Sequence, residues 1–279
     1  MTLTAPLIAD PFELDALDRQ LADTPFAGNI RHFASIDSTN TLAMREAEQG
    51  QQSNTVYLAD EQTVGRGRGK HEWHSAAGSG LYVSILVRPQ IAPADILWLS
   101  LATGLAAQAA IREVTSLAPD IRWPNDLLLS GRKLAGILTE LNAEVTRVRH
   151  VVIGIGINVH QPSFPSDMAT LATSLKIETG HSLPGPAWSR QDLLVALLRH
   201  LHQEIESLTK PRNLDAATAK IRRRLIAGSS WIQGKSVTVT ELDTFSGVTD
   251  GLDSRGFLRV RTVQGTRTVL SGGVREGRI

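Results

Sequence analysis

A glycine-rich basic segment is the strongest chemical signal in this sequence. It reads GRGRGK over residues 65–70, and Trp73 follows it. The glycines let the backbone approach a ligand closely, and the three cations can donate hydrogen bonds to a phosphate or a carboxylate. The tryptophan offers a flat face to a ring such as a nucleobase. The segment fits neither the Walker A nor the Rossmann glycine pattern, and an exposed basic loop without a ligand is the alternative interpretation.

A second signal joins a tryptophan–proline–asparagine–aspartate run to a lysine. Residues 123–126 read WPND, and residues 131–136 read GRKLAG. Lys133 begins an apolar strand, where its ammonium can be presented to an anion inside a pocket. The alternative is a plain hairpin in which Asp126 balances the charge of Lys133 or Arg132.

Two shorter motifs add polar groups to strand and helix ends. Residues 154–158, GIGIN, end a Val/Ile-rich strand, where glycines permit close approach and Asn158 can hydrogen-bond to a purine edge. Close packing of a central strand explains the glycines equally well. Residues 38–40, STN, suit a neutral amide or urea group, although helix capping alone also accounts for them.

Composition excludes several classes of protein. The 279 residues include 29 Lys and Arg against 28 Asp and Glu, and no cysteine. This excludes disulfide scaffolds, cysteine-ligated metals and thiolate nucleophiles, and it gives no global basic field for nucleic acid. The start of the chain has no signal-peptide pattern, and the apolar stretch from Ile96 to Ile111 is interrupted by polar residues. We expect a buried helix there and a soluble, cytoplasmic protein.

The elements that must position these motifs are a mixture of helices and strands. Asp10 and Glu13 predict a capping box for a first helix, and Ser189 with Asp192 predicts another. The expected strands cover residues 30–36, 55–59, 81–87, 121–123, 127–129, 133–141 and 147–159, with further helices over 39–50, after Pro93 and over 214–227. Residues 161–186 are expected to form a loop. Four short β-runs at 236–241, 245–249, 257–262 and 266–270 predict a small β-module.

The four motifs, in this order, resemble those of bacterial biotin protein ligases, and the resemblance covers about residues 30–279. It implies an α+β fold, with a class II synthetase-like catalytic domain whose mixed sheet is flanked by helices. A small SH3-like barrel would follow it. We expect the boundary at residues 1–230 and 231–279.

The resemblance also implies an activity. Biotin and ATP, with Mg²⁺ on the phosphates, would form biotinyl-5′-adenylate, and the biotin would then pass to a lysine of a biotin carboxyl carrier protein. The alternatives are a lipoate or octanoate ligase or transferase of the same fold, and a non-catalytic biotin sensor. The glycine–arginine loop and the β-module favour biotin. Lys133 and Arg68 argue against a sensor, because a sensor does not require cations for a transition state.

Roles for single residues follow from the resemblance. The side chains that would surround the biotin ureido ring are Ser38, Thr39, Asn40 and Gln62. The loop that would order over biotin and phosphate contains Arg66, Gly67 and Arg68. Trp73 would stack near adenine, and Asn158 would lie on the adenine side. Asp126 would orient Lys133 or deprotonate the acceptor lysine. The predicted catalytic residues are Lys133, Arg68 and Asp126. The predicted ligand-binding residues are Ser38, Thr39, Asn40, Gln62, Gly65, Arg66, Gly67, Arg68, Trp73, Asn125, Lys133, Gly136 and Asn158, with no protein ligand to a metal.

Three departures from the family pattern matter. His71 stands where members often carry an arginine, and Arg122 replaces a common lysine. Only 37 residues precede Ser38, which leaves no room for the winged-helix domain of repressor-type members. We therefore expect a monofunctional ligase that binds no specific DNA and no membrane. A homodimer formed by sheet extension is left open.

Overall fold

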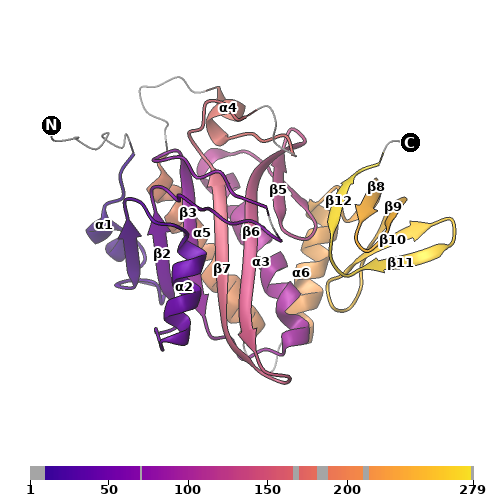
Figure 1. Cartoon of the computed structure of the whole chain (residues 1–279), viewed down its shortest axis with the longest axis horizontal. Coiled ribbons are helices and arrows are strands. Elements are labelled where there is room, and N and C mark those ends of the chain that lie inside the picture. The colour runs from indigo at the N-terminus through magenta and orange to yellow at the C-terminus, as the bar shows by residue number, and fades with distance from the viewer. Residues whose placement is uncertain (1–9, 70, 166–169, 181–187, 210–213, 278–279) are drawn as a thin grey trace.

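The fold is built on a seven-stranded mixed sheet, whose arrangement Figure 1 shows. The computed structural model describes residues 10–69, 71–165, 170–180, 188–209 and 214–277. The strand order is β1-β2-β3-β7-β6-β5-β4, in which only the β1–β2 pair is parallel. The strands are β1 (Ile30–Phe33), β2 (Thr55–Ala59), β3 (Gly80–Val87), β4 (Asp120–Arg122), β5 (Asp126–Leu129), β6 (Arg132–Ala143) and β7 (Val148–Asn158).

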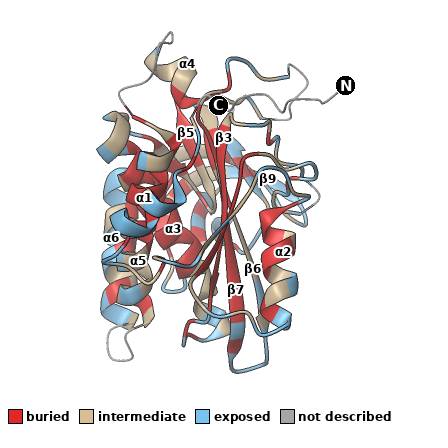
Figure 2. Cartoon of the chain, turned by 90° about the vertical axis from the view of Figure 1, so that its left-hand side faces the viewer, coloured by how far each residue is buried: buried red, intermediate tan, exposed pale blue. Residues whose placement is uncertain are grey.

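Helices cover both faces of this sheet. Figure 2 shows α2 on one side of the buried strands and α3, α5 and α6 on the other. The helices are α1 (Leu14–Gln20), α2 (Thr39–Glu48), α3 (Ile96–Thr115), α4 (Leu175–Thr179), α5 (Arg190–Thr209) and α6 (Leu214–Gly228), with a 3₁₀ turn at Pro93–Asp95 before α3. The sheet with flanking helices confirms the expected fold class.

Helix α3 is the centre of the core. Its length and hydropathy would suit a membrane span, but 72% of the apolar window between Pro93 and Thr115 is buried inside the fold. It packs against α5 and α6 and contacts β6. The polar side chain of Thr103 is satisfied by the carbonyl of Leu99 at 2.8 Å, so it does not disturb the apolar packing. This confirms the expected buried helix.

The C-terminal residues form a separate five-stranded antiparallel sheet, as expected for an SH3-like module. Its order is β11-β10-β9-β8-β12, and the strands are β8 (Gln233–Thr240), β9 (Thr244–Leu252), β10 (Leu258–Thr262), β11 (Gly265–Val269) and β12 (Gly273–Glu276). The last strand was not expected from the sequence. Trp123 donates its indole N–H to the carbonyl of Gly256 at 3.0 Å, which ties the module to the β4–β5 turn.

Two local expectations were wrong and two were confirmed. Helix α1 begins at Leu14 without a side-chain cap, and Asp10 instead binds residues far away in the chain. The expected loop over residues 161–186 contains α4; its residues 166–169 and 181–187 lie outside the described part. Ser38 caps α2, and Ser189 forms its capping box with Asp192.

Candidate functional site

A pocket lies between the start of α2, the strands β6 and β7, and the segment that follows β2. It contains most of the residues that the sequence singled out. Its lining residues are Ser38, Thr39, Asn40, Gln62, Arg66, Gly67, Arg68, Trp73, Val83, Asn125, Lys133, Gly136, Ile137, Leu138, Gly154, Ile155 and Gly156.

One part of the pocket is neutral and polar. Gln62 accepts hydrogen bonds from the backbone N–H and the hydroxyl of Thr39 at 2.9 and 3.0 Å, and donates to Ser75 at 2.9 Å. Ser38 caps the helix by accepting from the N–H of Thr41. These partners hold each side chain in one orientation at a buried helix start, so the polar groups are preorganised for a neutral ligand group.

Asn40 is hydrogen-bonded to two strands and lies close against a third. Its amide donates to Glu140 on β6 at 2.9 Å, and its carbonyl lies 2.5 Å from the hydroxyl of Ser84 on β3. Gly154 on β7 makes room for it, because a Cβ there would lie 2.1 Å from the Asn40 oxygen. The glycine is therefore required by a close approach of a side chain within the protein.

The glycine-rich loop folds back as a short hairpin. Gly67 donates its N–H to the carbonyl of His71 at 2.8 Å, and Trp73 donates to Gly65 at 2.9 Å. Arg66 makes a two-pronged pair with Glu140, at 2.7 and 3.0 Å. Lys70, the last cation of the loop, lies outside the described residues.

Arg68 reaches from this loop to the C-terminal module. Its guanidinium donates to the side-chain oxygen of Asn125 at 3.3 Å and to the backbone carbonyl of Gly272. Burial lowers the pKa of Arg68, and this effect outweighs the charge of Asp126, which acts in the opposite direction. A partly desolvated cation of this kind gains more from an incoming anion than an exposed one does.

Lys133 belongs to a charged group under the pocket. Its ammonium lies 2.7 Å from one oxygen of Asp126, and Arg122 holds the other oxygen at 2.6 Å. Burial alone would raise the pKa of Asp126, but the two cations outweigh burial and hold its pKa below the usual value. The carboxylate therefore stays ionised at neutral pH, which suits it to orient Lys133 and makes it a weak base.

Trp73 lies flat against the strands. A Cβ at Gly156 would be 2.5 Å from its indole ring, and one at Gly136 would be 3.0 Å away. Lys133 holds its ammonium 5.4 Å from the ring centroid. The indole N–H is buried and has no hydrogen-bond partner. Both predicted glycines therefore serve the position of this ring.

Three predicted residues do not line the pocket. Gly65 lies at the base of the hairpin, where a Cβ would lie 2.3 Å from the carbonyl of Trp73. Asp126 lies behind Lys133. Asn158 is 4% exposed and donates its amide to the carbonyl of Thr173 at 3.0 Å, so its donor is engaged within the protein.

Sequence reasoning missed the residues that support the others. Glu140, which binds both Asn40 and Arg66, is a charge within a largely apolar strand, and that position is the signal that could have identified it. Ser84 is fully buried in a strand of apolar residues, and this too is visible in the sequence pattern. Val83, Ile137, Leu138 and Ile155 give the pocket apolar walls.

The pocket thus combines a neutral polar end, apolar walls and three cations. It suits a ligand with an uncharged polar head and an anionic group. Within the described residues, no group of three or more His, Asp or Glu side chains is placed to hold a metal ion.

Comparison with known proteins agrees with this geometry. Residues 32–158 match the Biotin/lipoate A/B protein ligase family. The bifunctional ligase/repressor BirA of Bacillus subtilis (strain 168) is 33% identical over 249 residues, which cover 87% of this chain and 72% of that protein. The biotin–[acetyl-CoA-carboxylase] ligase of Paracoccus denitrificans is 30% identical over 242 residues, covering 85% and 96%.

A solved structure shows the same fold. The biotin protein ligase from Aquifex aeolicus in complex with biotin and ATP superposes with a TM-score of 0.73 at 28% identity, covering 89% of this chain and 99% of that one. The shared length, the fold and the ordered motifs lead to one assignment. The chain belongs to the biotin/lipoate A/B protein ligase family.

Proposed function

We propose that this protein is an ATP-dependent biotin protein ligase. It forms biotinyl-5′-AMP from biotin and ATP and then transfers the biotinyl group to a lysine of a biotin carboxyl carrier protein. The relatives named as biotin ligases, and the similar structure that holds biotin and ATP, support the two small substrates. The observation that carries the proposal is a pocket whose neutral polar end and cationic end face the same ligand space.

The neutral end suits the ureido ring. Ser38, Thr39 and Asn40 offer donors and acceptors at a buried helix start, and Gln62 fixes Thr39. A ureido group has two N–H donors and one oxygen acceptor, so it can satisfy buried groups that a hydrocarbon chain would leave unpaired.

The cationic end suits the adenylation step. The biotin carboxylate attacks the α-phosphorus of ATP, a bond to phosphorus forms, and pyrophosphate leaves with the electron pair of the broken bond. Lys133 and Arg68 stabilise the negative charge on the phosphoryl oxygens, and Asn125 orients Arg68. Asp126 keeps Lys133 in place, and its lowered pKa favours this role over deprotonation of the acceptor lysine.

ATP chemistry of this class uses Mg²⁺, which neutralises phosphate charge when it is bound. We assign the ion to the phosphates of ATP and to water; within the described residues, no group of three or more His, Asp or Glu side chains is placed to hold a metal ion. The aromatic ring of Trp73 and the amide of Asn158 stay our candidates for the adenine side.

The test is transfer to a carrier domain. Purified protein, biotin and ATP are incubated with a biotin carboxyl carrier domain, and the product is analysed by mass spectrometry. We expect the mass of one biotinyl group on one lysine, dependent on both substrates. A carrier domain that stays unmodified while another ligase modifies it would contradict the proposal.

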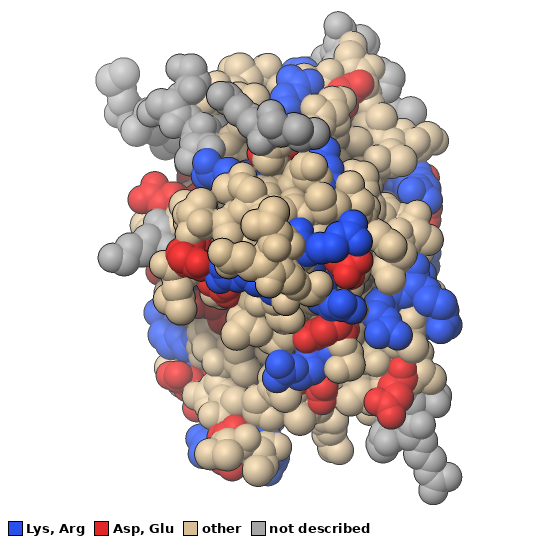
Figure 3. Space-filling model, turned by 90° about the vertical axis from the view of Figure 1, so that its right-hand side faces the viewer, with Lys and Arg blue, Asp and Glu red and all other residues tan. Residues whose placement is uncertain are grey.

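Two further properties are part of the proposal, and the oligomeric state is a third point to test. We assign the protein to the cytoplasm, and we assign it no specific DNA target. Figure 3 shows acidic and basic side chains interspersed over the face that carries the C-terminal module, where Arg267 pairs with Asp243 and Lys235 with Glu276. Such a face offers a DNA duplex no continuous basic surface for its phosphates. Sedimentation with and without biotin and ATP tests for a homodimer.

A further inference from the structure

Residues 61–79, which lie between β2 and β3, carry Gln62, the glycine-rich hairpin and Trp73, and are called the strap. Its two ends meet. Gly78 donates its N–H to the carbonyl of Asp60 at 3.0 Å, and Ser79 accepts from the N–H of His160 at 2.6 Å. The position of the strap over the pocket therefore depends on what holds this junction.

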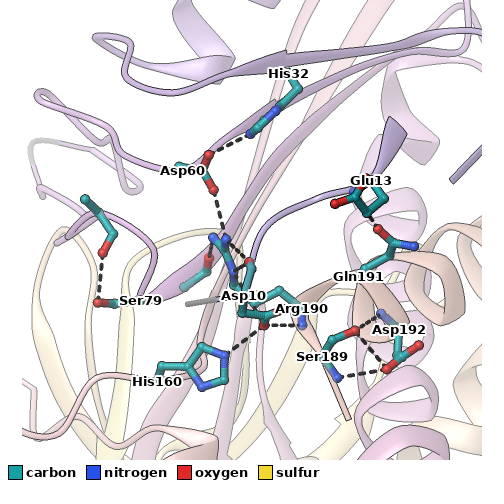
Figure 4. A network of polar contacts seen from close by, with 12 residues as sticks. Asp10, Glu13, His32, Asp60, Ser79, His160, Ser189, Arg190, Gln191 and Asp192 are labelled. Atoms are coloured by element: carbon teal, nitrogen blue, oxygen red, sulfur yellow. Dashed lines mark hydrogen bonds and ion pairs between the residues drawn. The ribbon is translucent and has the colours of Figure 1, made fainter. Parts of the chain in front are cut away.

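Arg190, the first residue of α5, contacts the two residues that flank the strap, and Figure 4 shows its contact with one of them, Asp60. One guanidinium nitrogen donates to the carboxylate of Asp60 at 2.9 Å, and another donates to the carbonyl of Gly80 at 3.3 Å. The side chain is completely buried, with 0% exposure. A buried arginine far along the chain thus bridges the last residue before the strap and the first residue after it.

The N-terminal segment fixes the arginine in turn. The carboxylate of Asp10 accepts a hydrogen bond from the backbone N–H of Arg190 at 2.7 Å. The backbone carbonyl of Asp10 accepts another from Nε of the Arg190 side chain at 3.1 Å. The ring of Phe12 lies 4.5 Å from the guanidinium carbon. The donors of the fork are thereby directed to fixed acceptors on three segments of the chain.

Two histidines complete the network that Figure 4 shows. His32 on β1 binds the second oxygen of Asp60 at 2.7 Å, and His160 binds Asp10 at 2.9 Å. His160 also stacks on Trp188 with ring centroids 5.9 Å apart. Since a buried charge is tolerated only when it is paired, loss of one member of such a network leaves its partner unsatisfied.

We infer that Arg190 is a positioning residue for the strap, acting through Asp60 and Gly80, and that the segment carrying Asp10 and Phe12 keeps Arg190 in place. The inference rests on the proposed function, in which the strap retains the acyl-adenylate until the acceptor lysine arrives. The planar guanidinium can reach several acceptors at fixed angles, which an ammonium group cannot do. A small displacement of the strap would open the pocket to water and weaken its hold on the intermediate.

The experiment compares Arg190→Lys and Asp60→Asn with wild type. The enzyme is loaded with labelled biotinyl-adenylate, excess unlabelled biotin is added, and loss of bound label is followed. We expect dissociation to be about tenfold faster in Arg190→Lys, because substitutions that disturb a binding surface act mainly on the dissociation rate. Asp60→Asn keeps the shape of the side chain but weakens the pair, so a smaller increase is expected.

A second measurement does not depend on ligase activity. Limited trypsin digestion reports cleavage after Arg66 and Arg68 in the strap, and the variants are expected to be cut there faster than wild type, without a change at other sites. Glu204→Gln is the matched control: it removes a partly buried carboxylate of α5 that pairs with Arg224 at 2.5 Å, away from the strap. It is expected to change the melting temperature without changing adenylate dissociation or cleavage in the strap.

The outcomes distinguish a failure of the proposed function from a failure of the role inferred for Arg190. Wild type that binds no biotinyl-adenylate at all contradicts the proposed function, and the digestion then still tests whether Arg190 positions the strap. Folded variants that hold the adenylate and resist trypsin like wild type overturn the inference. If both variants lose cooperative unfolding, the network has a structural role alone, and this result also overturns the inference.

Discussion

The cations at the pocket each have a partner within the protein. Arg66 is paired with Glu140, Arg68 with Asn125 and Gly272, and Lys133 with Asp126. These pairs keep the cations near the ligand space, where an incoming anion can share or replace the present partners. Two of the partners are neutral oxygens, so Arg68 has the most to gain from a phosphate or carboxylate.

Replacement of Lys133 by alanine tests this at the level of one residue. We expect the rate of adenylate formation to fall by about 10²-fold, since removal of one donor to a developing anion costs this much in other enzymes. Asp126 keeps its pair with Arg122 in the variant, so the melting temperature should fall by only a few degrees. Pyrophosphate release in a single turnover measures the rate.

Arg132→Ala is the control for that variant. Arg132 precedes Lys133 on the same strand and pairs with Glu178 at 2.8 Å, outside the pocket. It should leave adenylation close to wild type. Equal loss of rate in the two variants would show that Lys133 has only a structural role.

At the scale of the elements, strand β7 brings two glycines to the positions where side chains from elsewhere must enter. Gly154 accommodates Asn40, and Gly156 accommodates Trp73. The regular β-pleat places residues two apart on the same face, so the Gly-x-Gly spacing puts both gaps on the face toward the pocket. One strand thereby aligns the neutral and the aromatic parts of the site.

Gly154→Ala should therefore weaken ligand binding more than it weakens the fold. The new methyl group would lie 2.1 Å from the Asn40 oxygen and would push that amide away from the pocket. We expect the Kd for biotin to rise by about tenfold or more, because buried donors and acceptors lose their aligned partner. Isothermal titration with biotin measures it.

Gly104→Ala supplies the matched control for that substitution. Gly104 lies in α3, where the nearest atom to a new Cβ would be 3.7 Å away. Alanine should stabilise the helix by about 0.5–1 kcal/mol and leave biotin affinity unchanged. A similar loss of affinity in both variants would contradict the role given to Gly154.

Elements whose apolar residues recur with a clear period could be predicted well from the sequence. Strand β3 was expected over 81–87 and spans Gly80–Val87, because its apolar alternation is uninterrupted. Strand β12, with only four residues, carries no such pattern. Asp10 looked like a helix cap because capping is a local rule, whereas its actual partners lie at positions 160 and 190.

The site, like the fold, could be predicted where its residues follow one another in the sequence. The motifs that line the pocket are each contiguous in sequence, and the neutral and cationic ends could be named from residue types. The partners were not predictable, since Arg66 and Glu140 are separated by 74 positions and no local pattern links them. The adenine-side role of Asn158 stays a prediction.

At the scale of the whole molecule, the body and the C-terminal module share one hydrophobic core. Trp98 and Leu101 of α3 belong to the same buried cluster as Val237 and Leu258 of the module. The proposed boundary at residue 230 therefore separates two sheets that pack together, and it stays a prediction as a division into independently folding domains.

The buried carboxylates make the stability of the whole fold depend on pH. Burial would raise the pKa of Asp10 and of Asp60, but hydrogen bonds from His160 and His32, with the charge of Arg190, hold both pKa values below the usual 3.8. Asp126 behaves in the same way. The unfolded chain binds protons more readily at these groups, so their stabilising effect is present above about pH 4 and is lost as the pH falls below that.

We therefore expect the melting temperature to fall steeply as the pH is lowered from about 5 to 3. Asp60→Asn should start with a lower melting temperature at neutral pH and show a shallower decline, because one of the titrating groups is gone. Asp15→Asn, on the exposed side of α1, is the control and should follow wild type. Calorimetry across this pH range measures all three, and parallel curves for Asp60→Asn and wild type would contradict the assignment.

The central claim is that this pocket activates biotin with ATP. Exchange between ATP and pyrophosphate that depends on the carboxylic acid substrate tests this claim most directly. Biotin, octanoate and lipoate are compared at equal concentration with the purified protein. The account predicts exchange with biotin at least about 10²-fold faster than with octanoate, because only the ureido ring can pair with Ser38, Thr39 and Asn40. Exchange that is equal with octanoate or lipoate, or that does not depend on biotin, would contradict it.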